Sequence, residues 1–396
     1  MLAPALRQLD PRDPAYATRF VELTLTAARA AQASDVHFQP TPRGLQVAWR
    51  LDGVLQQVGE FPPGGTTDVV TRLKVLAQLL TYRTDQPQEG RARLAEGADW
   101  RVSTFPTLHG ERAVTRLVSA SHAPRTLTDL GLPAAVVAGL TASLAETAGV
   151  LLLTGPAGSG KTTTAYACLR ELIRPQPHLR CVVSLEDPIE SPLEGVAQSQ
   201  VQSQGTFDLA TGLRSILRQD PEVILVGEIR DATTAEAVLG AALTGHLVLT
   251  TFHASSAAGA VSRLAEMGIE PYVLRSGLRA VLHQRLLRRL CSCRRPASEP
   301  TEHLGLPVAA SWVAVGCSAC QGTGYSGRLV LAEWLRTEPT ELGRAILSRD
   351  DAAHLARLAR AAGLVPVAQQ ALAAVESGHT SALEVRRILG GCADEG

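Results

Sequence analysis

One segment constrains the fold of this chain more than any other. It reads Gly155-Pro156-Ala157-Gly158-Ser159-Gly160-Lys161-Thr162, is followed by Thr163, and matches the pattern GxxxxGK[ST]. In a loop of this form, backbone N–H groups at a helix N-terminus and a reaching lysine converge on phosphate oxygens. The apolar run at 150–153 and the helix-compatible run after Thr162 are the strand and helix that such a loop needs. The segment therefore predicts a nucleotide-binding P-loop, against the alternative of an ordinary glycine-rich turn.

Two side chains of this loop have predicted roles. Lys161 is expected to contact the β- and γ-phosphates, and the hydroxyl of Thr162 is expected to bind Mg²⁺. ATP and Mg²⁺ are therefore the ligands that we expect for 155–163.

The surrounding sequence alternates between apolar strands and helix-like runs from 131 to 336. Such alternation predicts a parallel sheet covered by helices. Within it, 134–154 reads as helix, turn and buried strand, because polar residues interrupt its apolar run. The helix-like and alternating segments of 1–120 predict a smaller α+β domain. We expect a linker at 121–130 and short amphipathic helices at 337–396.

Length and charge narrow the class of protein. At 396 residues the chain exceeds what one core usually organises, so we expect two or three domains. Its 38 basic and 38 acidic residues cancel and no long basic run occurs, which disfavours bulk nucleic-acid binding. No segment has the uninterrupted apolar length of a membrane span, and the first ten residues do not read as a signal peptide. We therefore expect a cytoplasmic protein without a transmembrane segment.

Two further apolar strands end in acidic residues. The run 181–185 leads to Glu186, and the run 223–226 leads through Gly227 to Glu228. α/β sheets bind ligands at the carboxyl ends of their strands, and a carboxylate near the nucleophilic water can activate it. Glu228 and Glu186 are therefore the candidate catalytic residues. Taken alone, Glu228 could equally begin a surface turn.

These motifs, in this order, resemble the ATPases of type II secretion and type IV pilus biogenesis. The resemblance covers about 20–335 and rests on segments of the first domain at 33–37, 50–53 and 101–111, the P-loop, an aspartate box at 184–190, an atypical Walker B motif at 227–231 and a histidine box at 244–254. It implies an α/β fold in which a RecA-like P-loop domain with a parallel sheet follows a smaller α+β, PAS-like domain. A cysteine-rich insertion at 291–320 and a helical C-terminus complete the implied architecture.

The resemblance implies further nucleotide-binding residues. Four arginines match family positions that contact the nucleotide, and two histidines belong to the histidine box: Arg101, Arg116, Arg214, Arg218, His246 and His253. Arginine suits developing phosphoryl charge because its planar fork makes bidentate contacts. For each arginine a solvated surface role is the alternative, and each histidine could instead cap the sheet.

Four of the seven cysteines lie close together late in the chain. They are Cys291, Cys293, Cys317 and Cys320, and they supply enough thiolates for a structural zinc site. The family's assembly members carry such a tetracysteine element, usually as two CxxC pairs, whereas retraction motors generally lack it. Here the first pair is CxC, which strains the usual arrangement, and free thiols are the alternative. Cys168 and Cys181 read as core residues.

The function that the resemblance implies is a homohexameric motor. It would hydrolyse ATP to power assembly of type IV pili, or of a type II secretion or competence pseudopilus, at the inner face of the membrane, where a platform protein would hold it. Larger relatives carry a further N-terminal docking domain, so we expect docking here to be reduced, rerouted or supplied by another protein. A DNA- or effector-transfer ATPase, a pilus retraction motor and an inactive scaffolding subunit remain as alternatives.

Overall fold

The computed structural model describes residues 2–61, 66–93, 99–118, 126–174, 180–201, 207–338 and 340–390. The first five residues of the expected linker, 121–125, lie outside these ranges. The chain forms two compact units, Met1–His122 and Ala123–Gly396. None of the helices in the described ranges is both long enough and apolar enough to cross a membrane.

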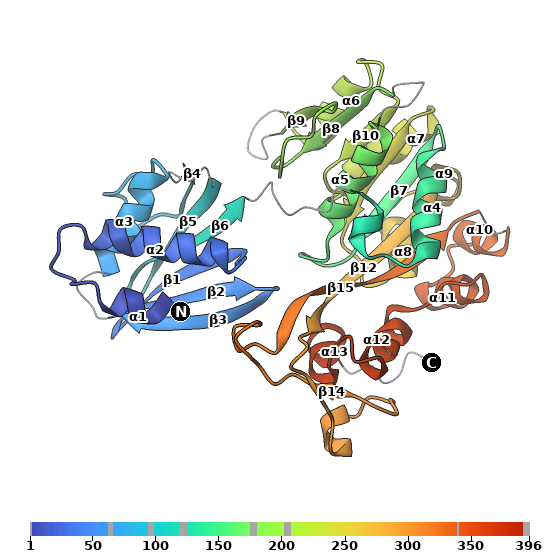
Figure 1. Cartoon of the computed structure of the whole chain (residues 1–396). Helices are drawn as coiled ribbons and strands as arrows, with labels where there is room; N and C mark the ends of the chain where they lie inside the picture. The colour runs from blue at the N-terminus through green and yellow to red at the C-terminus, as the bar shows by residue number, and fades with distance from the viewer. Residues whose placement is uncertain are drawn as a thin grey trace. The chain divides into compact units, whose positions relative to one another are not determined.

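The first unit is a six-stranded antiparallel sheet with helices on one face (Figure 1). Its strand order is β3-β2-β1-β6-β5-β4. In chain order the elements are α1 Leu2–Arg7, α2 Tyr16–Ala30, β1 Asp35–Thr41, β2 Gly44–Leu51, β3 Val54–Phe61, α3 Thr66–Leu76, β4 Gln88–Arg93, β5 Asp99–Thr107 and β6 Gly110–Val118.

The core of this unit lies between the helices and the sheet. Phe20 of α2 and Leu73 of α3 join Phe38, Trp100 and Val102 of the strands in one buried cluster. Because strand side chains alternate between faces, Arg101 and Ser103 belong to the face away from this core. The α+β domain expected before the P-loop is therefore present.

The second unit is built on a seven-stranded sheet of order β15-β12-β7-β11-β10-β8-β9. Its strands are β7 Gly149–Thr154, β8 Val182–Glu186, β9 Ala197–Gln200, β10 Val223–Val226, β11 Leu247–Phe252, β12 Leu278–Leu290 and β15 Tyr325–Arg336, and a separate small pair consists of β13 Arg295–Pro296 and β14 Trp312–Val313.

Helices cover both faces of this sheet (Figure 1). One face packs against α4 Ala134–Leu144 and α5 Lys161–Leu172, and the other against α6 Leu209–Ile216, α7 Ala232–Leu243, α8 Ala257–Glu266 and α9 Pro271–Gly277. The remaining elements are the 3₁₀ turns η1 Thr128–Leu130 and η2 Pro300–His303 and the helices α10 Thr340–Leu347, α11 Ala352–Ala361, α12 Val367–Glu376 and α13 Ala382–Leu389.

Local chemistry accounts for several of these boundaries. Every residue of β7 is buried, as its run of apolar side chains predicts for a central parallel strand. Helix α7 begins where the side chain of Asp231 accepts a hydrogen bond from the Thr234 N–H at 2.7 Å. The reading of 134–154 as helix, turn and strand is confirmed by α4 and β7.

The sheet extends beyond the parallel strands that the motifs predict. Strand β12 runs parallel to β7, and β15 then pairs with β12 in antiparallel register. The expectation of a parallel sheet is therefore correct for every strand except β15, which forms one edge. Helices α12 and α13 pack against the distal part of this pair, where Leu287 and Leu331 lie in a separate small core.

Candidate nucleotide site and cysteine cluster

The P-loop leaves the carboxyl end of β7 and enters α5. Gly155, Gly158 and Gly160 have φ angles of 144°, 74° and 94°, a region that favours glycine. At Gly155 the space is also closed, because an added Cβ would collide with the carbonyl oxygen of Gln284 on β12. The glycines therefore permit the backbone path of the loop, and at Gly155 this path runs close to the main chain of β12.

Lys161 points back into this loop. Its Nζ donates hydrogen bonds to the carbonyl oxygens of Gly155 and Pro156, each at 2.9 Å. Burial lowers the pKa of Lys161, and the negative charge of Glu228 opposes that shift. A phosphate group entering the loop would offer this ammonium charged acceptors in place of the two carbonyls. Thr162, the next residue, is exposed on the first turn of α5.

Glu186 is buried at the end of β8, with 3% of its surface exposed. Its carboxylate accepts hydrogen bonds from the hydroxyls of Tyr166 at 2.5 Å and Ser184 at 2.6 Å and from the Gln198 amide at 3.1 Å. Burial and the carboxylate of Glu186 raise the pKa of Tyr166, so the phenol stays a donor. These three donors hold Glu186 in one position.

Glu228 lies after β10, which is the neighbour of β8 in the sheet. Its Oε1 accepts a hydrogen bond from Arg230 Nε at 2.6 Å, and its Oε2 lies 3.9 Å from His253 Nε2. Arg230 Nη1 also lies 3.6 Å from Oδ2 of Asp187, which follows Glu186. Arg230 thus bridges the acidic residues that follow β8 and β10, Asp187 and Glu228. The sequence motifs did not assign this role to it.

The two histidines of the histidine box lie at opposite ends of β11. His253 follows the strand and lies beside Glu228. His246 precedes the strand, and its Nδ1 lies 2.8 Å from the Ala241 carbonyl oxygen. At about 3.3 Å per residue, the strand between them spans about 20 Å. Within one chain, the fold brings His253 and not His246 to the edge of the sheet that carries the P-loop.

The two arginines of the 209–218 segment lie apart from this group in the described contacts. Arg214 is exposed on α6, and Arg218 is exposed just after it. The Arg218 side chain lies 3.5 Å from the Ser215 hydroxyl. Both cations therefore extend from the surface of the second unit.

Arg101 and Arg116 belong to a row across the sheet of the first unit. They are direct cross-strand partners, and Asp35 is the partner of Arg116 on its other side. Arg116 Nε donates to Asp35 Oδ1 at 2.8 Å, Arg50 Nε lies 3.5 Å from Asp35 Oδ2, and Arg101 pairs with Glu89. The buried carboxylate of Asp35 thus orients two arginines on the face away from the core.

Sequence reasoning missed the residues that hold these candidates in place. Tyr166, Ser184 and Gln198 surround Glu186, although they come from α5, β8 and β9. The only local signal was a tyrosine in an otherwise apolar stretch of helix. Their convergence depends on the order of the strands, which no single motif contains.

The four late cysteines converge at the end of β12. All four Sγ atoms lie within 4.8 Å of one another. Cys291 and Cys317 are 3.8 Å apart, Cys293 and Cys320 are 3.9 Å apart, and Cys317 and Cys320 are 3.7 Å apart. Four thiolates at about 2.3 Å from Zn²⁺ lie about 3.8 Å from one another in a tetrahedron. The cluster therefore has the dimensions of a metal site, despite its CxC spacing.

Backbone donors favour the thiolate form of one member of this cluster, Cys320. The N–H groups of Cys317 and Gly324 donate to Cys320 Sγ at 3.1 Å and 3.2 Å. Burial raises the pKa of Cys320, but these bonds and the neighbouring thiols outweigh it and lower that pKa to about 6. A deprotonated sulfur is the form that ligates a metal.

Known proteins are similar to this chain over most of its length. The family model described as type II/IV secretion system protein matches residues 10–387. Type II secretion system protein E of Klebsiella pneumoniae is 44% identical over 335 residues, which are 83% of this chain and 67% of the relative. The type IV pilus assembly ATPase PilB of Thermus thermophilus is 37% identical over 94% of this chain and 43% of its own length.

Solved structures show the same fold. The ATPase DotB of Legionella pneumophila superposes with a TM-score of 0.68 at 24% identity, over 94% of this chain and 96% of that one. The pilus retraction motor PilT with bound ADP superposes with a TM-score of 0.60 at 24% identity, over 93% of this chain and 99% of that one.

Proposed function

Because the chain belongs to the type II/IV secretion system protein family, we propose that it is a homohexameric motor ATPase that powers assembly of a type IV pilus or a type II secretion pseudopilus. ATP hydrolysis is supported by the family as a whole. The assembly direction draws on the relatives named for type II secretion and pilus assembly, and on the cysteine cluster that the retraction motors generally lack.

One observation carries the proposal at the level of chemistry. The buried ammonium of Lys161, the carboxylates of Glu186 and Glu228, and His253 meet at the carboxyl edge of one sheet. This edge is where α/β sheets bind nucleotides, and the P-loop lies at it. A cation that binds phosphate and a carboxylate that can accept a proton from water are groups that ATP hydrolysis uses.

Each residue has a proposed role. The backbone of 155–163 and Lys161 bind the phosphates, and the Thr162 hydroxyl holds Mg²⁺. Glu228 accepts the proton of the attacking water, while Arg230 and His253 orient its carboxylate. Glu186 is held so firmly by its three donors that we assign it a positioning role near the metal and the water, alongside the catalytic role expected from its motif.

The remaining candidates have proposed roles as well. We propose that Arg101, Arg116, Arg214 and Arg218 contact the nucleotide, and that His246 does so only if a neighbouring copy brings the nucleotide to its end of β11. The cysteine cluster is proposed to hold structural Zn²⁺. The motor is proposed to work in the cytoplasm at the inner membrane, bound to a platform protein and to no nucleic acid.

The chemical test compares Glu228, which follows β10, with Glu222, which precedes it. We expect Glu228→Gln to lower ATP turnover at least 100-fold while ATP still binds, because a carboxamide keeps the shape but cannot take the proton. Glu222→Gln is the matched control: Glu222 precedes the same strand at its opposite end, where it accepts a hydrogen bond from the Cys181 N–H. Lys161→Ala is expected to lose both binding and turnover. Equal turnover in the two glutamine variants would remove Glu228 from the catalytic role.

The direction of the motor is tested in the source organism. Replacing the wild-type chain with Glu228→Gln should abolish surface fibres or secretion if the motor assembles them. Longer or more numerous fibres in the same strain would identify a retraction motor and overturn the assembly proposal.

A further inference from the structure

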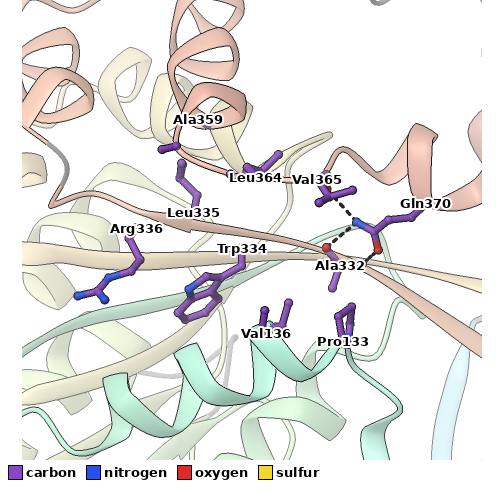
Figure 2. Close-up of a pocket in the computed structure, with 13 residues that line it drawn as sticks. Pro133, Val136, Ala332, Trp334, Leu335, Arg336, Ala359, Leu364, Val365 and Gln370 are labelled. Atoms are coloured by element: carbon purple, nitrogen blue, oxygen red, sulfur yellow. Dashed lines mark hydrogen bonds between the residues drawn. The ribbon is translucent and has the colours of Figure 1, made fainter.

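A groove runs along the free edge of the large sheet in the second unit (Figure 2). The edge strand is β15, which pairs with β12 on one side only. Helix α4 forms one wall, and the segment between α11 and α12 forms the other. The cavity measures about 400 Å³, and its lining is mostly apolar. Unpaired strand edges are templates for the addition of another strand.

The main chain of β15 shows which residues present this edge. Gln370 of α12 accepts a hydrogen bond from the Ala332 N–H at 3.0 Å and donates to the Ala332 carbonyl at 2.7 Å. The N–H and C=O of Ala332 therefore point away from β12. Because the backbone direction repeats every second residue, Trp334 and Arg336 present their N–H and C=O groups to the same side.

The side-chain amide of Gln370 takes the place of a neighbouring strand. It satisfies both polar groups of Ala332 with the donor and acceptor that a strand residue would supply (Figure 2). For Trp334, the next outward residue, no such partner exists within the described part of the chain. The edge is thus closed at Ala332 and open at Trp334 and Arg336, which lie about 7 Å apart along the strand.

The walls of the groove suit an apolar side chain from an added strand. Val136 of α4 and Leu364 of the opposite wall face the space beside Trp334 (Figure 2). Val365, also in the lining, is 47% exposed. An apolar side chain between these walls would cover surface that water now contacts.

The charge of the groove selects the chemistry of the occupant. Arg336 is the only charged residue in the described lining, and its side chain is 53% exposed. It pairs with Glu338, which lies outside the groove, and a guanidinium has donors for a second acceptor. An acidic residue of a partner would therefore share Arg336 with Glu338, and the described lining itself contains no carboxylate.

We propose that this groove is a docking site for an extended segment of a partner protein, which adds to β15 as a strand at Trp334 and Arg336. The segment carries a branched apolar side chain for the cavity and an acidic residue for Arg336. Main-chain hydrogen bonds supply the binding, and the pocket and the charge supply the preference, as in other strand-addition complexes. This inference does not depend on the nucleotide chemistry proposed above.

The test uses a fluorescein-labelled peptide of alternating threonine and valine with a glutamate at each end, acetylated and amidated. Ala135→Glu should weaken binding of the peptide to the full chain at least tenfold. Ala135 is exposed and lines the groove, so that a glutamate there would place bulk and negative charge in the space that the peptide needs. Ala134→Glu is the matched control: it is the preceding residue of α4, is also exposed and does not line the groove. Both acids lie at a helix N-terminus, so neither should disturb folding.

Two further measurements separate strand addition from adhesion. N-methylation of one alternate set of peptide residues should abolish binding, since it removes the donors that face β15. Hydrogen exchange at the Trp334 and Arg336 amides should slow at least tenfold when the peptide binds, whereas exchange at Leu335, which is already paired with β12, should not change.

The charge preference has its own test. A peptide with glutamines at its ends should bind at least threefold more weakly than the peptide with glutamates, and Arg336→Gln should remove that difference.

Several results would overturn the proposal. They are the absence of binding by the peptide, equal binding to Ala135→Glu and Ala134→Glu, or full binding by both N-methylated forms. Loss of the oligomer in Ala135→Glu alone, seen by sedimentation velocity, would show that a second copy of this chain occupies the groove.

Discussion

His283 provides the sharpest quantitative prediction of this structure. It lies on β12 beside Thr154, the last residue of β7, and only 1% of its surface is exposed. Neither ring nitrogen has a hydrogen-bond partner in the described part of the chain. Burial, followed by the positive charges of Arg285 and Lys161, lowers the pKa of His283 to about 3. The folded protein therefore keeps this imidazole neutral.

The pH dependence of stability follows from this shift. An unfolded histidine titrates near pH 6.5, so the unfolded chain gains a proton that the folded chain refuses as the pH falls below that value. The contribution of His283 is complete above pH 6.5 and is lost progressively as the pH falls toward 3. With these two pKa values, the free energy of unfolding falls by about 2 kcal/mol between pH 8 and pH 5 on account of His283 alone.

The assay is urea unfolding of wild type and His283→Leu at pH 8 and pH 5. Leucine has no proton to gain, so the variant should lose about 2 kcal/mol less than wild type between the two pH values. Contributions from the other groups and from the first unit cancel in this difference. His379→Gln, a change at an exposed histidine, is the control for the loss of an imidazole. A difference between His283→Leu and wild type below about 0.5 kcal/mol would refute the reasoning.

Three further predictions follow from individual contacts. Tyr166→Phe removes a hydrogen-bond donor from the buried Glu186 carboxylate. It should lower the free energy of unfolding, measured by urea unfolding, by about 1–3 kcal/mol, and it should also lower ATP turnover. An unchanged stability would show that this hydrogen bond is dispensable. Purified protein should contain one zinc per chain by elemental analysis, and Cys320→Ser should lose it and lower the Tm; metal-free wild type of the same Tm would contradict a structural zinc site. Gly139→Ala places a Cβ 2.5 Å from the Trp334 ring and should destabilise the chain by about 1–3 kcal/mol, whereas Gly240→Ala on α7, where the space is open, should not.

The candidate site could be predicted from short sequence motifs, because each motif consists of a strand end and the loop that follows it. The glycines of 155–160, the acids after 181–185 and 223–226, and the alternation of strands and helices could be read directly. In a parallel sheet all carboxyl ends share one edge, so these segments had to meet there. The structure brings Lys161, Glu228 and His253 together in this way.

The long strand pair was not predicted, because its surroundings change along its length. The first half of β12 lies between the two main cores, while Leu287 and Arg288 of its second half contact the C-terminal helices. Arg288 is buried against Glu384 of α13 at 2.8 Å, which no alternation of apolar and polar residues announces. Neither the strand that supports Gly155 nor the groove on β15 could therefore be read from spacing alone.

The sequence by itself determined the groups that this protein offers: a glycine-rich loop that ends in a lysine, two acids at strand ends, a histidine after β11 and four clustered thiols. These follow from residue types at short spacings, where local backbone geometry dictates what a side chain can reach. Only the tertiary structure decided which distant groups meet. It placed His246 and His253 at opposite edges, surrounded Glu186 with donors from three elements, and drew four sulfurs together across a CxC spacing. The physical reason is that strand order and packing set these distances, and both depend on the whole core.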